Sequence, residues 1–193
     1  GIIDWKDQVV IGQSGMPKWN FSTFTSFKWK NWSIDALFQG ATGYTVNFGD
    51  AAGYGGISGH QSVAKKYQFE NRSLLGANGD IEVLRKFPPA FTTGGLPQSD
   101  TRSNDFTKID AFYLRLKTLN ITYNLPKSLT SSLGLDYVQV YGSGSNVFTL
   151  DNFDVYSGSY DPEIITSAGD GGGGVDRAYP NVRTWTAGLK VGF

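Results

Sequence analysis

The sequence predicts an all-β protein that forms part of an antiparallel transmembrane β-barrel, and three observations indicate this fold class. Five segments alternate between apolar and polar residues with the period of two that strands require. Their connections are short, long, short and long in turn, like the short periplasmic turns and long extracellular loops of outer-membrane barrels. Aromatic residues make up 15% of the chain and 25 of its 193 residues are glycine, a composition typical of strands and turns.

The first predicted hairpin joins segments 19–29 and 32–40. From Trp19 to Trp29 the odd positions carry most of the apolar residues, with Phe24 as the exception, and a tryptophan stands at each end, as the aromatic girdles of membrane barrels require. After a short turn, the even positions from Trp32 onward continue the apolar face. The next connection, 44–108, holds only a possible short helix near residues 62–69. So long a connection is uncommon in a compact soluble domain and favours the barrel.

The third and fourth predicted strands cover about residues 111–125 and 136–148, with a short connection between them. In the third strand the apolar residues from Leu119 onward are out of phase with those up to Leu116, which indicates a β-bulge near Lys117. The fourth strand leaves two facings open, because the tyrosines at 137 and 141 compete with the valines at 138 and 140. A second long loop, 149–181, leads to the last strand.

The last ten residues form the clearest strand. One face carries Trp185, Ala187, Leu189, Val191 and Phe193, and the other carries threonines, glycines and a lysine. Ten tilted residues are enough to cross a bilayer. Because the chain ends on an aromatic in phase with the apolar face, as outer-membrane barrel strands end, we predict that Trp185, Leu189, Val191 and Phe193 form an assembly signal. Taken alone, the segment fits an edge strand of a soluble sandwich equally well.

The number of strands predicts a fragment of a larger barrel. Five strands are an odd number and too few to close a barrel. We therefore expect residues 1–193 to be one portion of a barrel whose other strands lie outside this chain. With Phe193 at the periplasmic end, the turns near Asn31 and Lys127 share its side of the membrane. Loops 44–110 and 149–181 and residues 1–18 then lie outside.

Sequence blocks along nearly the whole chain resemble, in order, blocks of the SusC/RagA-type TonB-dependent transporters of Bacteroidetes. The blocks are Met16–Trp19, Phe112–Pro126, Gly142–Thr149, Tyr160–Glu163 (with Ser159 in place of a glycine) and Tyr179–Trp185. The resemblance implies a 22-stranded barrel with an N-terminal plug, of which this chain is the C-terminal portion. It also implies import of a glycan or an oligopeptide across the outer membrane. The implied partners are a SusD-like surface lipoprotein, TonB, the plug and outer-membrane lipid.

The start of the chain resembles the second half of a family loop with calcium-loop spacing. Gly1 would be the turn glycine, Ile2 would offer its backbone carbonyl, and Asp7 would be the closing carboxylate. The earlier ligand positions would precede Gly1, and a plain acidic turn is the alternative. Apart from this Ca²⁺, no cofactor is expected.

Composition excludes several other functions. The 17 Lys and Arg residues balance 17 Asp and Glu residues, so the chain gives no sign of a nucleic-acid-binding surface. It has no cysteine and a single histidine, His60, so neither a thiolate metal site nor histidine-based catalysis is expected. Asp161 and Glu163 could be an acid/base pair, but their loop setting favours a structural contact. No nucleophile–base pattern indicates an enzyme, and no catalytic residue is predicted.

The main rival interpretation is a secreted β-sandwich binding module with a calcium loop. The two interpretations differ in the surroundings of the apolar side chains. A barrel wall must expose them to lipid, whereas a sandwich must bury them between two sheets. The side chains that distinguish the two are Trp19, Phe21, Phe27, Trp29, Leu189 and Val191.

Overall fold

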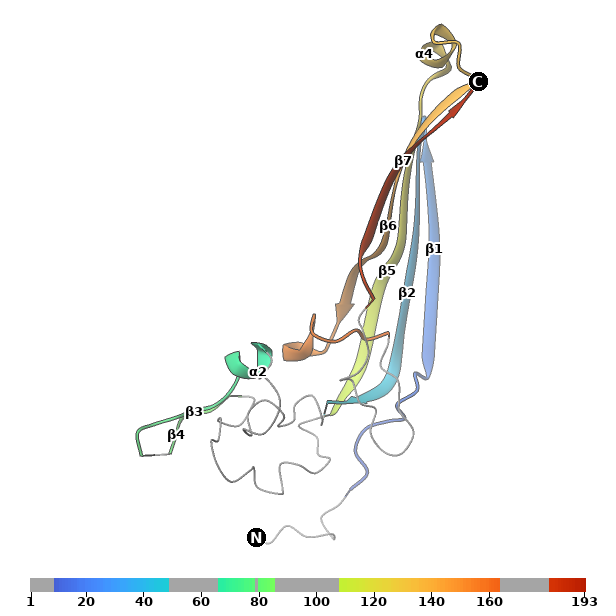
Figure 1. Cartoon of the computed structure of the whole chain (residues 1–193). Coiled ribbons are helices and arrows are strands. Elements are labelled where there is room, and N and C mark those ends of the chain that lie inside the picture. Colours follow the sequence, from blue (N-terminus) through green and yellow to red (C-terminus); the bar gives the residue numbers. More distant parts are fainter. Residues whose placement is uncertain (1–8, 49–65, 79, 86–107, 164–180) are drawn as a thin grey trace. The chain divides into compact units, whose positions relative to one another are not determined.

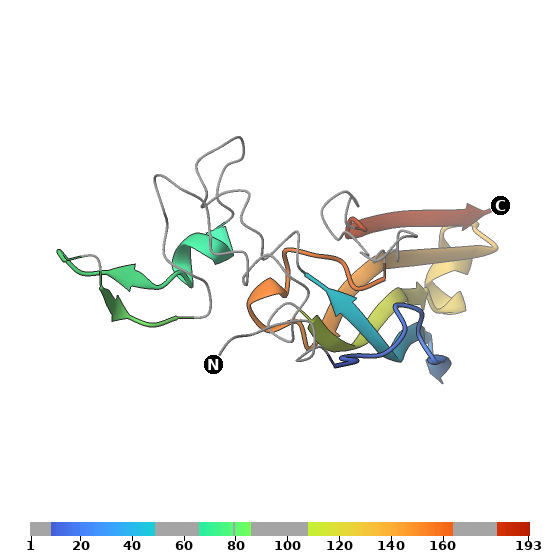
Figure 2. The same cartoon turned by 90° about the horizontal axis from the view of Figure 1, so that it is seen from below.

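The computed structural model describes residues 9–48, 66–78, 80–85, 108–163 and 181–193. Its main feature is a five-stranded antiparallel sheet with the order β1-β2-β5-β6-β7 (Figure 1). The strands are β1 (Trp19–Trp29), β2 (Trp32–Asn47), β5 (Lys108–Asn124), β6 (Tyr137–Asp151) and β7 (Thr184–Gly192). The sheet confirms the predicted all-β class, with β1 at one edge and β7 at the other (Figure 2).

The remaining described elements are small. They are the helices α2 (Lys66–Glu70) and α4 (Lys127–Ser132), the two-stranded sheet of β3 (Leu74–Leu75) and β4 (Ile81–Val83), and a 3₁₀ turn (Asp154–Tyr156). Within the described part of the chain, no helix has the length and apolar character needed to cross a membrane. The short helix expected near residues 62–69 begins at Lys66 in the described residues.

The chain divides into two compact units. One comprises residues 1–17, 43–111 and 152–179, and the other comprises residues 18–42, 112–151 and 180–193. The second unit holds β1, β7 and the greater part of the other long strands. We call it the wall unit, and the first the loop unit.

The turn between β1 and β2 is tied to the end of β5. Trp29 pairs with Trp32, so only two residues make the turn, and Lys30 adopts a left-handed φ of 53°. The Asn31 side-chain amide donates to the Asn124 carbonyl at 2.7 Å, and the Asn124 N–H donates to the Asn31 carbonyl at 2.9 Å. These two hydrogen bonds place the first turn and the end of β5 side by side.

A β-bulge interrupts the pairing of β5 with β6 at the level that the sequence predicts, but the extra residue lies on the other strand. Leu116 pairs with Phe148 and Thr118 with Ser145, so two residues of β6 oppose Lys117 alone. The first of the two, Asn146, has a φ of 51°, the left-handed conformation that the G1 type of bulge has at this position. The bulge predicted near Lys117 is thus confirmed, and the pairing adds that β6 carries the extra residue.

Between the bulge and the start of β5, the pairing groups side chains by polarity. Leu114 pairs with Leu150, two pairs beyond the Leu116–Phe148 pair and on the same face, because directly paired residues share a face and faces alternate along a strand. The other face carries Arg115, which is 3% exposed and whose Nε donates to the Thr149 hydroxyl at 2.8 Å. This hydrogen bond gives a buried guanidinium one of the partners that it needs.

Candidate functional site: two faces of one sheet

The wall unit has one continuous apolar face. Directly paired residues of antiparallel strands point to the same side, so the register identifies its members. On β1 and β2 they are Trp19, Phe21, Thr23, Thr25, Phe27, Trp29, Trp32, Ile34, Ala36, Phe38, Gly40 and Thr42. The rings of Trp32 and Tyr123 lie 4.6 Å apart and extend this face onto β5. There it continues through Leu119, Ile121, Tyr123, Val138, Val140, Gly142, Gly144, Trp185, Ala187, Leu189 and Val191.

Five of the six side chains that distinguish the two interpretations are exposed, which is what a barrel wall requires and a sandwich forbids. Trp19 is 69% exposed, Phe27 61% and Leu189 61%, and Phe21 and Trp29 are also exposed. Val191 is half-buried. All eleven residues of β1 are exposed, so no described residue covers either face of that strand. The β-sandwich alternative has no support in this arrangement.

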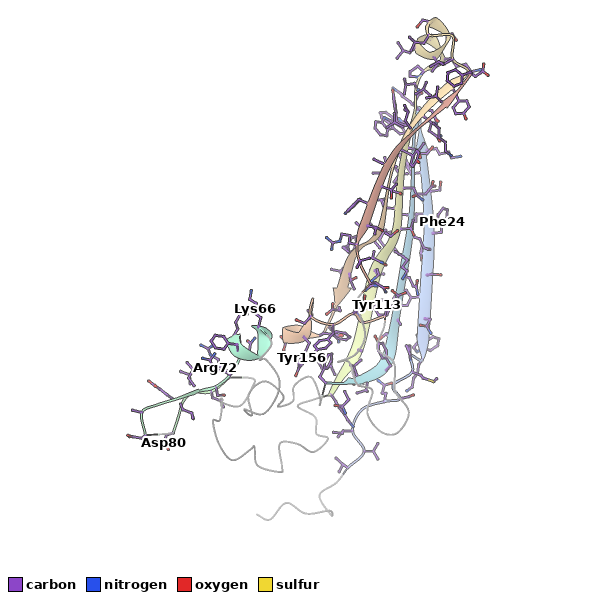
Figure 3. The ribbon with its side chains drawn as sticks, viewed as in Figure 1. Phe24, Lys66, Arg72, Asp80, Tyr113 and Tyr156 are labelled. Atoms are coloured by element: carbon purple, nitrogen blue, oxygen red, sulfur yellow. The ribbon has the colours of Figure 1, made fainter. Side chains whose placement is uncertain are left out.

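The opposite face is polar. Ser22 pairs with Gln39, and the Ser26 hydroxyl donates to the Asp35 carboxylate at 2.6 Å. Further along the sheet, the Gln139 amide donates to the Asn124 side-chain oxygen at 2.8 Å. Phe24, labelled in Figure 3, and its partner Leu37 are exceptions on this face. These hydrogen bonds run between neighbouring strands and leave the polar face open to water or to a polar partner.

The facing of the fourth strand, which the sequence left open, follows from its pairing. Tyr137, Gln139 and Tyr141 pair with Gly192, Lys190 and Gly188 on the polar face, and the valines lie on the apolar face. A Cβ at Gly188 or Gly192 would overlap the ring of the facing tyrosine. The two glycines therefore let the tyrosine rings lie flat across β7.

The predicted assembly signal lies along one edge of the sheet. Trp185, Leu189 and Val191 share the apolar face, while β7 ends at Gly192 and Phe193 follows it with 90% of its surface exposed. The Gly192 carbonyl accepts a 2.9 Å hydrogen bond from the Asp136 N–H, which ties the chain's end to the connection that contains α4. Figure 1 shows α4 and the C-terminus at the same end of the wall unit.

The loop unit contains an aromatic cluster that the sequence did not indicate. Phe48, Phe153 and Tyr156 are fully buried, and the rings of Phe48 and Tyr156 stack at 4.2 Å with an interplanar angle of 6°. Tyr160 meets Phe48 edge-on at 5.6 Å, and the Tyr44 hydroxyl donates to the Pro162 carbonyl at 3.3 Å. The segment after β6 is therefore packed against the end of β2. Nothing in the sequence pairs these aromatics, because they follow no strand or helix period.

Asp161 has a local structural role in the same segment. Its carboxylate accepts a 3.0 Å hydrogen bond from the Glu163 N–H, the short-range turn contact typical of aspartate. This contact supports the structural role that the sequence favoured over an acid/base pair.

A separate part of the loop unit is built from α2 and the β3–β4 hairpin. The guanidinium of Arg72, labelled in Figure 3, lies 3.8 Å from the centre of the Phe69 ring. Ser73 accepts a 2.9 Å hydrogen bond from the Arg85 N–H. These contacts hold the segment between α2 and β3 against the residues that follow β4. They form no cluster of acidic or nucleophilic groups.

The predicted metal ligands Asp7 and Ile2 lie outside the residues that the structure describes. His60 and the glycine run 171–174 also fall outside them. Among the residues that are described, no group of three or more His, Asp or Glu side chains is placed to hold a metal ion. The calcium site stays a prediction.

Comparison with known sequences gives relatives of one kind. TonB-dependent receptor P3 of Formosa agariphila is 28% identical over 202 residues, an alignment that covers 100% of this chain and 18% of the receptor. TonB-dependent receptor P26 of the same organism is 28% identical over 204 residues, again with 18% of the receptor covered. No protein-family model matches the chain. The chain thus spans less than a fifth of the length of these receptors.

Solved structures of the RagAB peptide importer share the fold. Its closed-closed state aligns with 100% of this chain and 19% of that chain, with a TM-score of 0.64 and 23% identity. Its open-open state gives a TM-score of 0.60 over 94% of this chain, also at 23% identity. At this identity the likeness shows the fold, which is part of a transporter barrel. The resemblance found in the sequence is thereby confirmed: over its whole length, this chain is similar to one segment of a TonB-dependent receptor of the SusC/RagA type.

Proposed function

We propose that this chain is the C-terminal part of the barrel wall of an outer-membrane TonB-dependent transporter. Its apolar face contacts lipid, its polar face lines the lumen or meets the plug, and its long connections lie outside the cell. The observation that carries the proposal is the exposed apolar face that continues across all five long strands. A soluble protein seldom leaves so large a continuous apolar surface in water.

The spacing of the aromatic rows supports a membrane crossing. Trp19 and Trp29 lie on the apolar face of one strand and are ten residues apart. At a rise of ~3.4 Å per residue and a tilt of ~40°, they are separated by about 26 Å along the membrane normal. The apolar band of an outer-membrane barrel is about 25 Å tall and is flanked by aromatic girdles. Trp29, Trp32 and Tyr123 would form one girdle, and Trp19 and Trp185 would belong to the other.

The two edges of the sheet require further strands. β1 and β7 are the outermost strands of the described sheet, and each has one edge without a described neighbour. In lipid, an unpaired backbone N–H or C=O costs several kcal/mol, so a membrane-spanning sheet must close. We propose that both edges pair with strands of the same barrel.

The partners and the cargo follow from the family resemblance. A SusD-like lipoprotein would cover the long connections from outside, and TonB would act through the plug. The RagAB neighbour is named a peptide importer, which supports an oligopeptide cargo, and a glycan is the alternative. We expect no catalytic activity of this chain.

Cysteine labelling in whole cells tests the topology. Ser131 in α4 and Ser159 in the segment after β6 are both exposed, and the proposal puts them on opposite sides of the membrane. An impermeant maleimide should label a cysteine at 159 in intact cells and a cysteine at 131 only after the outer membrane is permeabilised. Equal labelling of both in intact cells, or the reverse pattern, would overturn the proposal.

A further inference from the structure

The apolar face of the wall unit contains a groove. It has a volume of about 330 Å³ and lies over β5, β6 and β7. Its apolar lining comes from Leu119, Ile121, Gly142, Gly144, Trp185 and Ala187. All six belong to the continuous apolar face, so the groove opens on the side that the proposed function places against lipid.

The groove exists because its floor lacks side chains. Gly142 pairs with Ile121 on one side and with Ala187 on the other. For a Cβ at Gly142, the nearest described atom beyond its chain neighbours is the Thr186 carbonyl oxygen at 3.9 Å, so the space above the glycine is open. Leu119 and Ile121 rise on the β5 side of this floor. A strand with a β-branched or large residue at 142 would have no groove.

Trp185 closes one end of the groove. A Cβ at Gly144 would lie only 2.7 Å from the Trp185 ring, so the indole lies across that glycine. Trp185 is eight residues before Phe193, on the side of the wall that the proposed topology turns outward. Tryptophan prefers the level of the lipid head groups, because its ring is apolar and its N–H is polar. The groove therefore runs from that level toward the middle of the membrane.

We propose that this groove holds one acyl chain of an outer-membrane lipid, with the lipid head group near Trp185. This inference rests on the proposed function, which makes acyl chains the molecules in contact with the apolar face. An unfilled groove would leave its walls without dispersion contacts on one side. An acyl chain inside it touches two walls and a floor, whereas a chain elsewhere on the face touches one surface. The lipid in the groove consequently exchanges more slowly than its neighbours.

The test is native mass spectrometry of the full-length transporter, purified from outer membranes in a mild detergent and washed in steps. The wild-type protein should keep lipid of defined mass after the other lipids are removed. Gly142→Leu fills the groove and should lower the lipid-bound fraction by ~tenfold, equivalent to about 1.4 kcal/mol. Ala36→Leu places the same leucine side chain on the same face outside the groove and should leave that fraction unchanged.

The outcomes separate the inference from the function on which it rests. Wild-type protein that fails to appear in the outer-membrane fraction would refute the proposed function. Wild-type protein that is inserted but keeps no lipid would refute the groove, whatever the variants do. Equal lipid retention by wild type and Gly142→Leu would refute it as well. If Gly142→Leu does not insert, Ala187→Leu fills the same floor from β7 and takes its place.

Discussion

A positive charge placed at the middle of the apolar face should destabilise the barrel far more than one on the polar face. Leu189 is the position of choice, because it lies four residues from Trp185 and four from Phe193 and is 61% exposed. Four residues at ~3.3 Å each and a tilt of ~40° give about 10 Å along the membrane normal in either direction. Leu189 is then close to the bilayer midplane.

The expected cost of Leu189→Arg follows from this depth. An arginine that faces lipid at the midplane costs ~2–4 kcal/mol, which changes the folding equilibrium by about 30- to 700-fold. Ser22→Arg is the matched control, because Ser22 is exposed on the polar face of β1 opposite Gln39. The naturally occurring Lys190, next in sequence to Leu189, already lies on that polar face.

The assay measures how much urea the full-length protein in outer-membrane vesicles withstands before it loses its compact, heat-modifiable form. Leu189→Arg should lower this urea concentration markedly and reduce the amount of protein in the outer membrane. Ser22→Arg should behave nearly as wild type does. If the two variants are equally affected, or if only Ser22→Arg is impaired, then the assignment of the two faces is wrong.

Three further predictions concern the chain's end, the glycines under the tyrosines and the aromatic cluster. Phe193→Asp puts a charge at the end of the apolar row, so heat-modifiable protein in the outer membrane should fall sharply, and normal levels would contradict the assembly signal. Gly188→Val forces the Tyr141 ring to move, which should lower the free energy of unfolding by ~1–3 kcal/mol and reduce the urea concentration that the protein withstands. Adding Tyr141→Ala should restore most of the loss, and no restoration would show that the overlap is not the cause. Tyr156→Ala removes a fully buried ring and should lower the local stability of the aromatic cluster by ~3–5 kcal/mol. Protease added to whole cells should then cleave the long connections of this protein faster, and an unchanged cleavage rate would argue against the cluster.

The sequence predicted the strands best where the two faces of a strand lie in different surroundings. In 19–29, 32–40 and 184–193 every second residue meets the same surroundings, so polarity alternates with the period of the strand. This alternation shows which side chains lie on the apolar face. It predicted strand ends less well. β2 continues from Gly40 to Asn47, because its backbone keeps a partner although the simple alternation has stopped.

The sequence predicted least where two distant segments meet. A bulge belongs to a pair of strands, so the phase change near Lys117 could not show that Asn146 on β6 carries the extra residue. The stacking of Phe48 on Tyr156 joins positions more than a hundred residues apart, and neither position belongs to a periodic pattern. Sequence periodicity reports what surrounds a residue, whereas contacts such as these depend on which segment is its neighbour.

The aromatic cluster of the loop unit has a consequence for how such a protein can evolve. Phe48 stands where the first long connection leaves β2, and Phe153 and Tyr156 stand where the second leaves β6. Because both departures are packed against each other, insertions farther along a connection need not disturb the strands. Doubling the length of such a connection costs only ~0.6 kcal/mol in closure entropy. If the proposed topology holds, lineages can thus lengthen, shorten or replace the segments outside the cell and keep the same sheet.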